Sequence, residues 1–154
     1  MRRDLIALAG FVLLCLAVGG LGSVATASSV GSWYQQLAKP SFNPPDWVFA
    51  PVWTTLYVMI AIAGWRVWRR RALRGLPLMA YALQLALNLL WTVLFFGLRS
   101  PAAGAVEIVP LFAAILWTAV LFLRHDRWAG LLFLPYLLWV GFAAVLTVAI
   151  WSLN

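Results

Sequence analysis

The hydrophobic positions of this chain gather into five long stretches with few polar interruptions. They cover residues 5–27, 47–68, 76–98, 102–123 and 128–153. Each stretch is close to the roughly 20 residues that an α-helix needs to cross the hydrocarbon core of a bilayer. Strands of a membrane barrel would instead show alternating patterns of about 10 residues. The pattern therefore predicts an all-α polytopic membrane protein, a five-transmembrane-helix bundle that forms a single domain over residues 1–154.

Composition supports the membrane assignment and narrows the classes of partner. Hydrophobic residues make up 65% of the chain, against about 45–50% in soluble proteins, and only 10% of residues are charged. The net charge of +7 could suggest nucleic acid. However, most of it comes from arginines beside apolar stretches, which is typical of topology signals and lipid headgroups. We expect membrane lipid, and no nucleic acid, as a partner.

The first stretch allows two interpretations. Arg2 and Arg3, followed by an apolar run and then by Ala25–Ala27, are typical of a cleavable signal peptide. The same run is long enough to be a retained transmembrane helix. The residues of this stretch leave both interpretations open.

The basic residues predict the orientation of the bundle, because cytoplasmic loops carry an excess of Lys and Arg. With five spans, the N-terminus shares its side with the second and fourth loops. That side holds nine basic residues, namely Arg2, Arg3, Arg66, Arg69, Arg70, Arg71, Arg74, Arg124 and Arg127. The other side holds Lys39 and Arg99. We therefore expect a cytoplasmic N-terminus and a first loop on the opposite side.

The first loop, residues 28–50, is unusually rich in aromatic residues and proline. Proline fixes φ and removes a backbone donor, so the prolines of this loop make it stiff. Trp47 fits an interfacial aromatic belt. Trp33 and Tyr34 fit that explanation less well, because a long ordered loop often acts as a lid.

Polar and aromatic side chains fall on single faces of three stretches. Gln84, Asn88, Trp91 and Phe95 share one face of the third stretch, since three- and four-residue spacings are neighbours on a helix. Amides at membrane depth usually face the bundle interior, where they contact a ligand or bond neighbouring helices. The residues themselves leave these two roles equally open.

The second and fifth stretches carry aromatic stripes at matching depth. The stripes consist of Trp53 and Tyr57 in the second stretch, and of Pro135, Trp139, Phe142, Ala143 and Leu146 in the fifth. Bare aromatic stripes more often serve packing. However, these lie beneath the first loop with Asn88 and Trp91, and an aromatic cavity with a few polar groups and a lid is the usual form of a small-molecule site.

The sequence lacks the residues that several other kinds of functional site require. There is no phosphate-binding Gly-rich loop and no cluster with metal-ligand spacing, so we expect no metal. Glu107 lies about one turn into the fourth stretch, where a headgroup-level position is expected. His125 belongs to a short loop at the end opposite the proposed cavity, which leaves no credible Ser/His/Asp set. These absences favour a flat aromatic ligand held by stacking rather than by a metal bond.

The first-loop sequence resembles the signature of the translocator protein family, also known as the tryptophan-rich sensory protein family. The matching residues include Trp33-Tyr34, Lys39-Pro40, Pro44-Pro45, Trp47-Val48-Phe49, Pro51, Trp53-Thr54 and Leu56-Tyr57. Similar matches run through Ala86-Leu87-Asn88, Trp91, Phe95-Phe96-Gly97, Pro135-Tyr136-Leu137, Trp139 and Phe142-Ala143. They cover nearly the whole chain in the right order.

The resemblance implies a five-helix bundle, commonly a homodimer, that binds porphyrin or haem as a ligand and requires no cofactor. It implies ligand contacts by Trp33, Tyr34, Trp53, Tyr57, Asn88, Trp91, Phe95, Trp139, Phe142 and Ala143. Trp33 and Trp139 also match tryptophans implicated in light-dependent porphyrin breakdown by bacterial relatives, and would be the catalytic residues of such a reaction.

One segment departs from the animal members of this family. Their cholesterol-recognition motif needs a Tyr followed by a basic residue, and residues 144–154 contain neither. We therefore expect no cholesterol binding of that type. The short C-terminus makes the chain look bacterial, which implies a bacterial cell membrane. Three functions follow as hypotheses: a porphyrin receptor, a photo-oxidative porphyrin-degrading enzyme, and a transporter of small amphiphiles.

Overall fold

The protein is a bundle of long helices, described here by a computed structural model that covers residues 2–154. The elements are α1 (Arg2–Val30), α2 (Trp33–Gln36), the 3₁₀ turn η1 (Asp46–Val48), α3 (Phe49–Arg69), α4 (Leu76–Thr92), the π-helical turn η2 (Val93–Gly97), α5 (Pro101–Leu123), α6 (Arg127–Leu131) and α7 (Leu134–Leu153). They form five helical segments long and apolar enough to span a membrane. The all-α five-helix architecture predicted from the sequence is confirmed.

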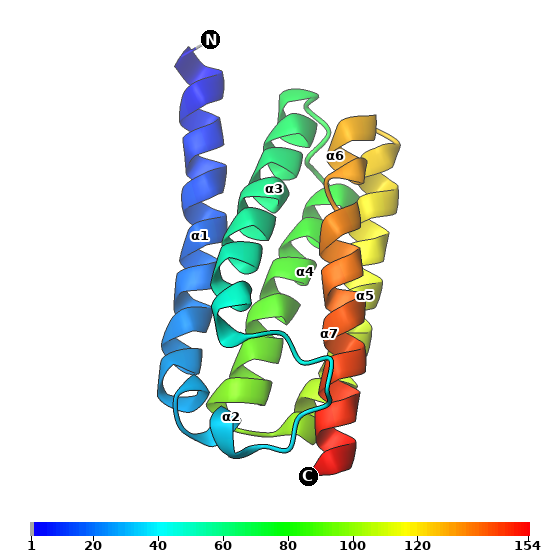
Figure 1. The fold of residues 1–154 in the computed structure, drawn as a ribbon. Coiled ribbons are helices and arrows are strands. Elements are labelled where there is room, and N and C mark those ends of the chain that lie inside the picture. Colours follow the sequence, from blue (N-terminus) through cyan, green and yellow to red (C-terminus); the bar gives the residue numbers. More distant parts are fainter. Residues whose placement is uncertain (1) are drawn as a thin grey trace.

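The long helices run up and down along one another, and the two termini lie at opposite ends of the bundle (Figure 1). The C-terminal ends of α3 and α5, which carry or precede most of the arginines, lie at the same end as the N-terminus (Figure 1). The segment between α1 and α3, which contains α2, crosses the other end, near the C-terminus. The first loop thus covers one end of the bundle, and the arginines other than Arg99 gather at the opposite end.

Local sequence sets where several helices begin. The side chain of Ser100 accepts a hydrogen bond from the Ala103 N–H at 3.2 Å, and Pro101 occupies the first helical position of α5. Both features are typical of helix N-termini. The expected single helix over 128–153 is broken into α6 and α7, because Pro135 lies in the first turn of α7 and lacks the N–H that would continue a helix from α6.

The core is centred on α5, whose buried side chains include Leu111, Ile115 and Phe122. Phe122 stacks on Tyr81 of α4 with ring centres 5.7 Å apart. Near the first-loop end, η2 and α5 meet at Gly104, where an added Cβ would lie 2.8 Å from the Phe95 ring. A side chain at this position would force the Phe95 ring to move, so glycine permits the close packing of α5 against η2.

Helix α1 joins the bundle through a few specific contacts. The Trp65 indole donates to the Asp4 carbonyl at 2.9 Å, and the Cys15 thiol lies 3.3 Å from the Tyr81 hydroxyl. At the other end the Ser29 hydroxyl donates to the Phe96 carbonyl at 2.7 Å. These contacts favour the interpretation of α1 as a retained helix.

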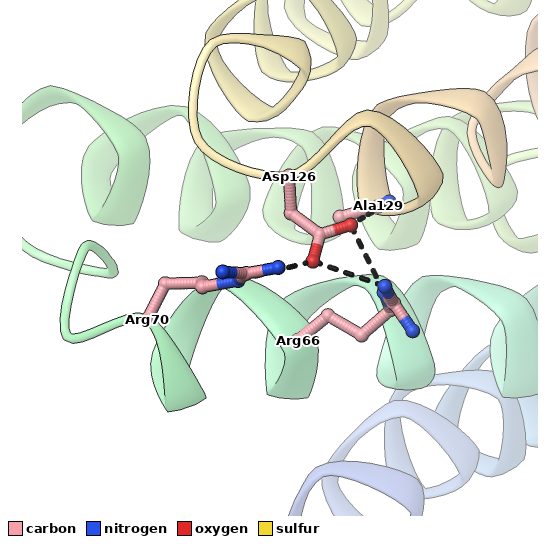
Figure 2. Close-up of polar contacts among 4 residues, drawn as sticks. All are labelled: Arg66, Arg70, Asp126 and Ala129. Carbon is pink, nitrogen blue, oxygen red and sulfur yellow. Dashed lines mark hydrogen bonds and ion pairs between the residues drawn. The ribbon is translucent and has the colours of Figure 1, made fainter.

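A cluster of charges holds α3 to the turn between α5 and α6, as Figure 2 shows. The Arg66 guanidinium donates to both carboxylate oxygens of Asp126, at 3.0 and 3.1 Å, and Arg70 lies 3.5 Å away. The same carboxylate accepts from the Ala129 N–H at 3.0 Å and so caps α6. Burial by itself raises the pKa of Asp126, but these hydrogen bonds and the two arginine charges together lower it below its usual value.

Candidate ligand-binding cavity

A cavity of about 400 Å³ lies beneath the first loop, bounded by α1, α3, α4 and α2. Its lining consists of Leu16, Gly19, Gly20, Gly22, Ser23, Thr26, Ala27, Val30, Tyr34, Asp46, Phe49, Ala50, Trp53, Thr54, Tyr57, Asn88, Trp91, Thr92 and Phe96. This volume falls within the range of small-molecule sites, about 300–1,000 Å³. One wall is aromatic and the opposite wall, from α1, is made of small residues.

A short chain of hydrogen bonds fixes the floor of the cavity. The Tyr57 hydroxyl donates to Asn88 Oδ1 at 2.7 Å, and Asn88 Nδ2 donates to the Tyr136 hydroxyl at 2.6 Å. Asn88 therefore bonds α3 and α7 to α4 while it also lines the cavity. Gln84 is fully buried and does not line the cavity, and its Nε2 donates to the Tyr81 carbonyl of its own helix.

The aromatic wall is held in place by ring contacts. The Trp53 ring lies 5.8 Å from that of Tyr57 and meets the Tyr136 ring edge-on at 6.2 Å. On α4, Trp91 stacks on Phe95 with ring centres 5.3 Å apart. The indole Nε1 of Trp91 is buried without a hydrogen-bond partner, which is unusual for a buried donor.

The π-helical turn η2 decides which phenylalanine reaches the cavity. The sequence-based expectation assumed a regular α-helix, in which Phe95 follows Trp91 on the same face. In η2 the hydrogen bonds run from residue i to i+5, as from the Leu98 N–H to the Val93 carbonyl at 2.8 Å. The wider turn carries Phe96 into the lining, whereas Phe95 is 2% exposed in the core.

The first loop forms the roof of the cavity and is held in place by specific contacts. Tyr34 is buried, its hydroxyl donates to Asn43 Oδ1 at 2.9 Å, and the Lys39 ammonium lies 4.7 Å above its ring. Burial, with a smaller contribution from the Asp46 charge, raises the pKa of Tyr34 to about 12. Ala38 exchanges two hydrogen bonds of 3.0 Å with the side chain of Asn154. The loop is thus tied to itself and to the end of α7.

The lining has few polar groups, and most of them are hydrogen-bonded within the protein. Among the lining residues within 2–154, Asp46 alone carries a charge, and its carboxylate accepts from Gln35. The hydroxyls of Ser23, Thr26, Thr54 and Thr92 donate to carbonyls of their own helices. The cavity therefore offers stacking and apolar contact rather than charge or metal ligation.

The ten expected ligand contacts divide between several locations. Tyr34, Trp53, Tyr57, Asn88 and Trp91 line the cavity together. Trp139 and Phe142 line a separate, open groove of about 570 Å³ between α3 and α7. Trp33 packs edge-on against Phe95 at 5.8 Å, and Ala143 packs half-buried against the core.

The groove and the cavity lie on different faces of α3 and come together at one ring contact. Phe49 lines the cavity, and its ring lies 5.9 Å from that of Trp139. The Trp139 indole Nε1 is buried without a hydrogen-bond partner. Glu107, expected at headgroup level, is 6% exposed, and both its carboxylate oxygens are buried in the bundle without a hydrogen-bond partner.

The wall from α1 was absent from the sequence-based expectation. Residues 16–30 of α1 include no aromatic side chain, whereas the expected ligand contacts are mostly aromatic and amide side chains. A signal was nevertheless present, because Gly19, Ser23 and Thr26 lie four and three residues apart. Small residues at that spacing form one helix face and permit close approach in membranes.

Comparisons with known proteins agree on one family over nearly the whole chain. The profile of the TspO/MBR family matches residues 11–152. The chain is 43% identical to the tryptophan-rich protein TspO of Chlorobaculum tepidum, over 100% of this chain and 99% of that protein. It is 36% identical to the tryptophan-rich sensory protein of Cereibacter sphaeroides, over 94% and 90% of the two chains. It is 37% identical to the translocator protein of Sus scrofa, over 94% and 88%.

Proposed function

Because this chain belongs to the TspO/MBR family and is an integral multi-pass membrane protein, we propose that it is a membrane receptor for porphyrin-type ligands. The observation that carries the proposal is the aromatic-walled cavity beneath the pinned first loop. The names of its relatives, a tryptophan-rich sensory protein and a translocator protein, support a receptor or sensor role. The membrane is that of a bacterial cell in this proposal, with the N-terminus in the cytoplasm.

A flat tetrapyrrole suits the chemistry of this lining. Trp53 and Trp91 offer ring faces and edges, and aromatic contacts contribute about 0.5–1.5 kcal/mol each beyond area burial. The indole N–H of Trp91 is buried without a partner, so it would donate to a carboxylate or carbonyl of the ligand only after the ring turned toward the cavity. Tyr34, Tyr57 and Asn88 complete the proposed contacts. Trp33, Phe95, Trp139, Phe142 and Ala143 remain predictions from the resemblance.

Titration of the protein with protoporphyrin IX in the dark tests the proposal. We expect saturable quenching of tryptophan fluorescence. Trp53→Phe and Trp91→Phe should each weaken binding by up to about tenfold, which is ~1.4 kcal/mol. Trp117→Phe and Trp128→Phe are matched controls, because both rings are exposed outside the cavity.

Two results would overturn the proposal. Quenching that does not saturate would mean that porphyrin merely partitions into the bilayer around the protein. Controls that weaken binding more than the cavity variants would place the site elsewhere. Trp139→Phe adds a third comparison, since a loss of affinity there would show that the ligand also reaches the groove.

A further inference from the structure

The cavity beneath the first loop is open on one side, and the residues on that side belong to two neighbouring transmembrane helices. The exposed members of the lining include Gly20, Ser23 and Ala27 on α1, and Ala50 and Thr54 on α3. All five lie within the spans Arg2–Val30 and Asp46–Arg69. The opening between α1 and α3 therefore faces hydrocarbon rather than water.

The opening exists because α1 changes its packing partner along its length. Up to Gly19 it lies against α3, where an added Cβ would come within 2.8 Å of the Tyr57 ring. Beyond that point it lies against α4 and η2, with Gly22 beside Thr92 and the Ser29 hydroxyl bonded to the Phe96 carbonyl. Past Gly19 the cavity separates α1 from α3.

The rim of the opening suits an apolar solvent. The Ser23 hydroxyl donates to the Gly19 carbonyl at 3.0 Å, and the Thr54 hydroxyl donates to the Ala50 carbonyl at 2.8 Å. Neither hydroxyl needs water as a partner, and an unsatisfied polar group in hydrocarbon would be costly. The other three of these five residues are glycine and alanine, which leave room for a ligand to pass. Leu16 and Asp46 are also exposed members of the lining, and the Asp46 carboxylate, at the first-loop end, accepts a hydrogen bond from Gln35.

Hydrogen bonds within the first loop and to the end of α7 hold this loop over the cavity. A ligand that came through the first loop would have to separate Tyr34 from Asn43 and Ala38 from Asn154. The rim hydrogen bonds of Ser23 and Thr54 each stay within one helix, so neither joins α1 to α3. The two routes thus differ in which contacts must move.

We propose that the ligand enters the cavity sideways from the bilayer, through the opening between α1 and α3, in the leaflet on the side of the first loop. The protein then selects amphiphiles that are already dissolved in the membrane. This inference rests on the proposed function, because it concerns access to the same cavity.

Stopped-flow fluorescence in phosphatidylcholine nanodiscs, with protoporphyrin IX as the probe, tests the route. Gly20→Leu places a branched side chain in the opening, where a Cβ meets no atom within 4 Å, so the helix tolerates it. We expect association to slow by about tenfold or more, a barrier higher by ~1.4 kcal/mol, and dissociation to slow as well. Ala27→Leu, seven residues along the same face, should act in the same way. Gly10→Leu is the matched control, because Gly10 is equally open but lies outside the lining, and its rates should equal those of the parent.

Asn154→Ala releases the tie between the loop and α7 and reports on the other route. Sideways access predicts parental rates for this variant. The inference is overturned if Asn154→Ala speeds association while both leucine variants keep parental rates. It is also overturned if the leucine variants lower affinity through faster dissociation while association keeps the parental rate. Failure of the receptor proposal looks different, because the parent protein itself would then show no saturable quenching.

Discussion

Asp126 should be one of the most sensitive positions for stability, because a single carboxylate serves two functions at the arginine-rich end. It caps α6 through the Ala129 N–H and binds Arg66 through both oxygens, and its side chain is only 4% exposed. Loss of an N-cap costs about 1 kcal/mol. Hydrogen bonds to a charged partner contribute about 1.5–3 kcal/mol. Asp126→Ala should therefore destabilise the protein by about 3 kcal/mol.

Asp126→Asn separates the two functions. Asparagine caps helices about as well as aspartate, so this variant keeps the cap and loses the charge. It should destabilise the protein, but by less than Asp126→Ala does. Arg70→Ala is a matched control, because its side chain is 64% exposed and a surface pair contributes about 0–1 kcal/mol.

The assay is unfolding of the purified protein in mixed micelles with increasing SDS, followed by tryptophan fluorescence. The pH dependence adds a sign test. The pKa of Asp126 is lowered in the folded state, so its contribution is present above the unfolded value near 3.8 and is lost as the pH falls through the lower folded value. Asp126→Asn should lack this acid-dependent component. The reasoning is refuted if Asp126→Asn and Asp126→Ala destabilise equally, or if neither destabilises more than Arg70→Ala.

Three further predictions concern topology, assembly and photochemistry. In a variant without Cys15, a cysteine at Arg70 should react with thiol reagents from the cytoplasm and a cysteine at Lys39 from the opposite side; the reverse pattern would invert the bundle. A homodimer is expected from the family resemblance, and mass measurement in mild detergent and in nanodiscs that gives only monomer would contradict it. A receptor should not consume porphyrin under light faster than the protein-free control; loss that is abolished by Trp33→Phe or Trp139→Phe would instead support the degrading enzyme.

The spanning helices could be predicted because the bilayer imposes a length on every apolar stretch. The expected segment 76–98 is observed as Leu76–Gly97, and 102–123 as Pro101–Leu123. The sequence does not reveal which helix faces which. Trp139 shares a depth with the cavity, but its face of α7 turns to the groove on the other side of α3.

The cavity itself could be predicted only in part, for two physical reasons. Face assignments assume regular α-helical spacing, and η2 breaks that spacing where Phe95 and Phe96 compete for one position. Aromatic and amide residues also stand out in a sequence, whereas a wall of glycine and alanine does not. The residues found, such as Trp53 and Asn88, are those whose side chains make the cavity floor and wall.

The slight burial of α1 has a consequence for local stability. Of its 29 residues only Cys15, Gly22 and Ser29 are buried, whereas ten are buried in α5. Segments with few buried contacts open most easily and exchange their amide hydrogens first. A ligand in the cavity would touch α1 and α3 at once, so binding would stabilise the docked form of α1 by mass action. Ligand binding would then slow the exchange of the amide hydrogens of α1, and this slowing would report whether the cavity is occupied.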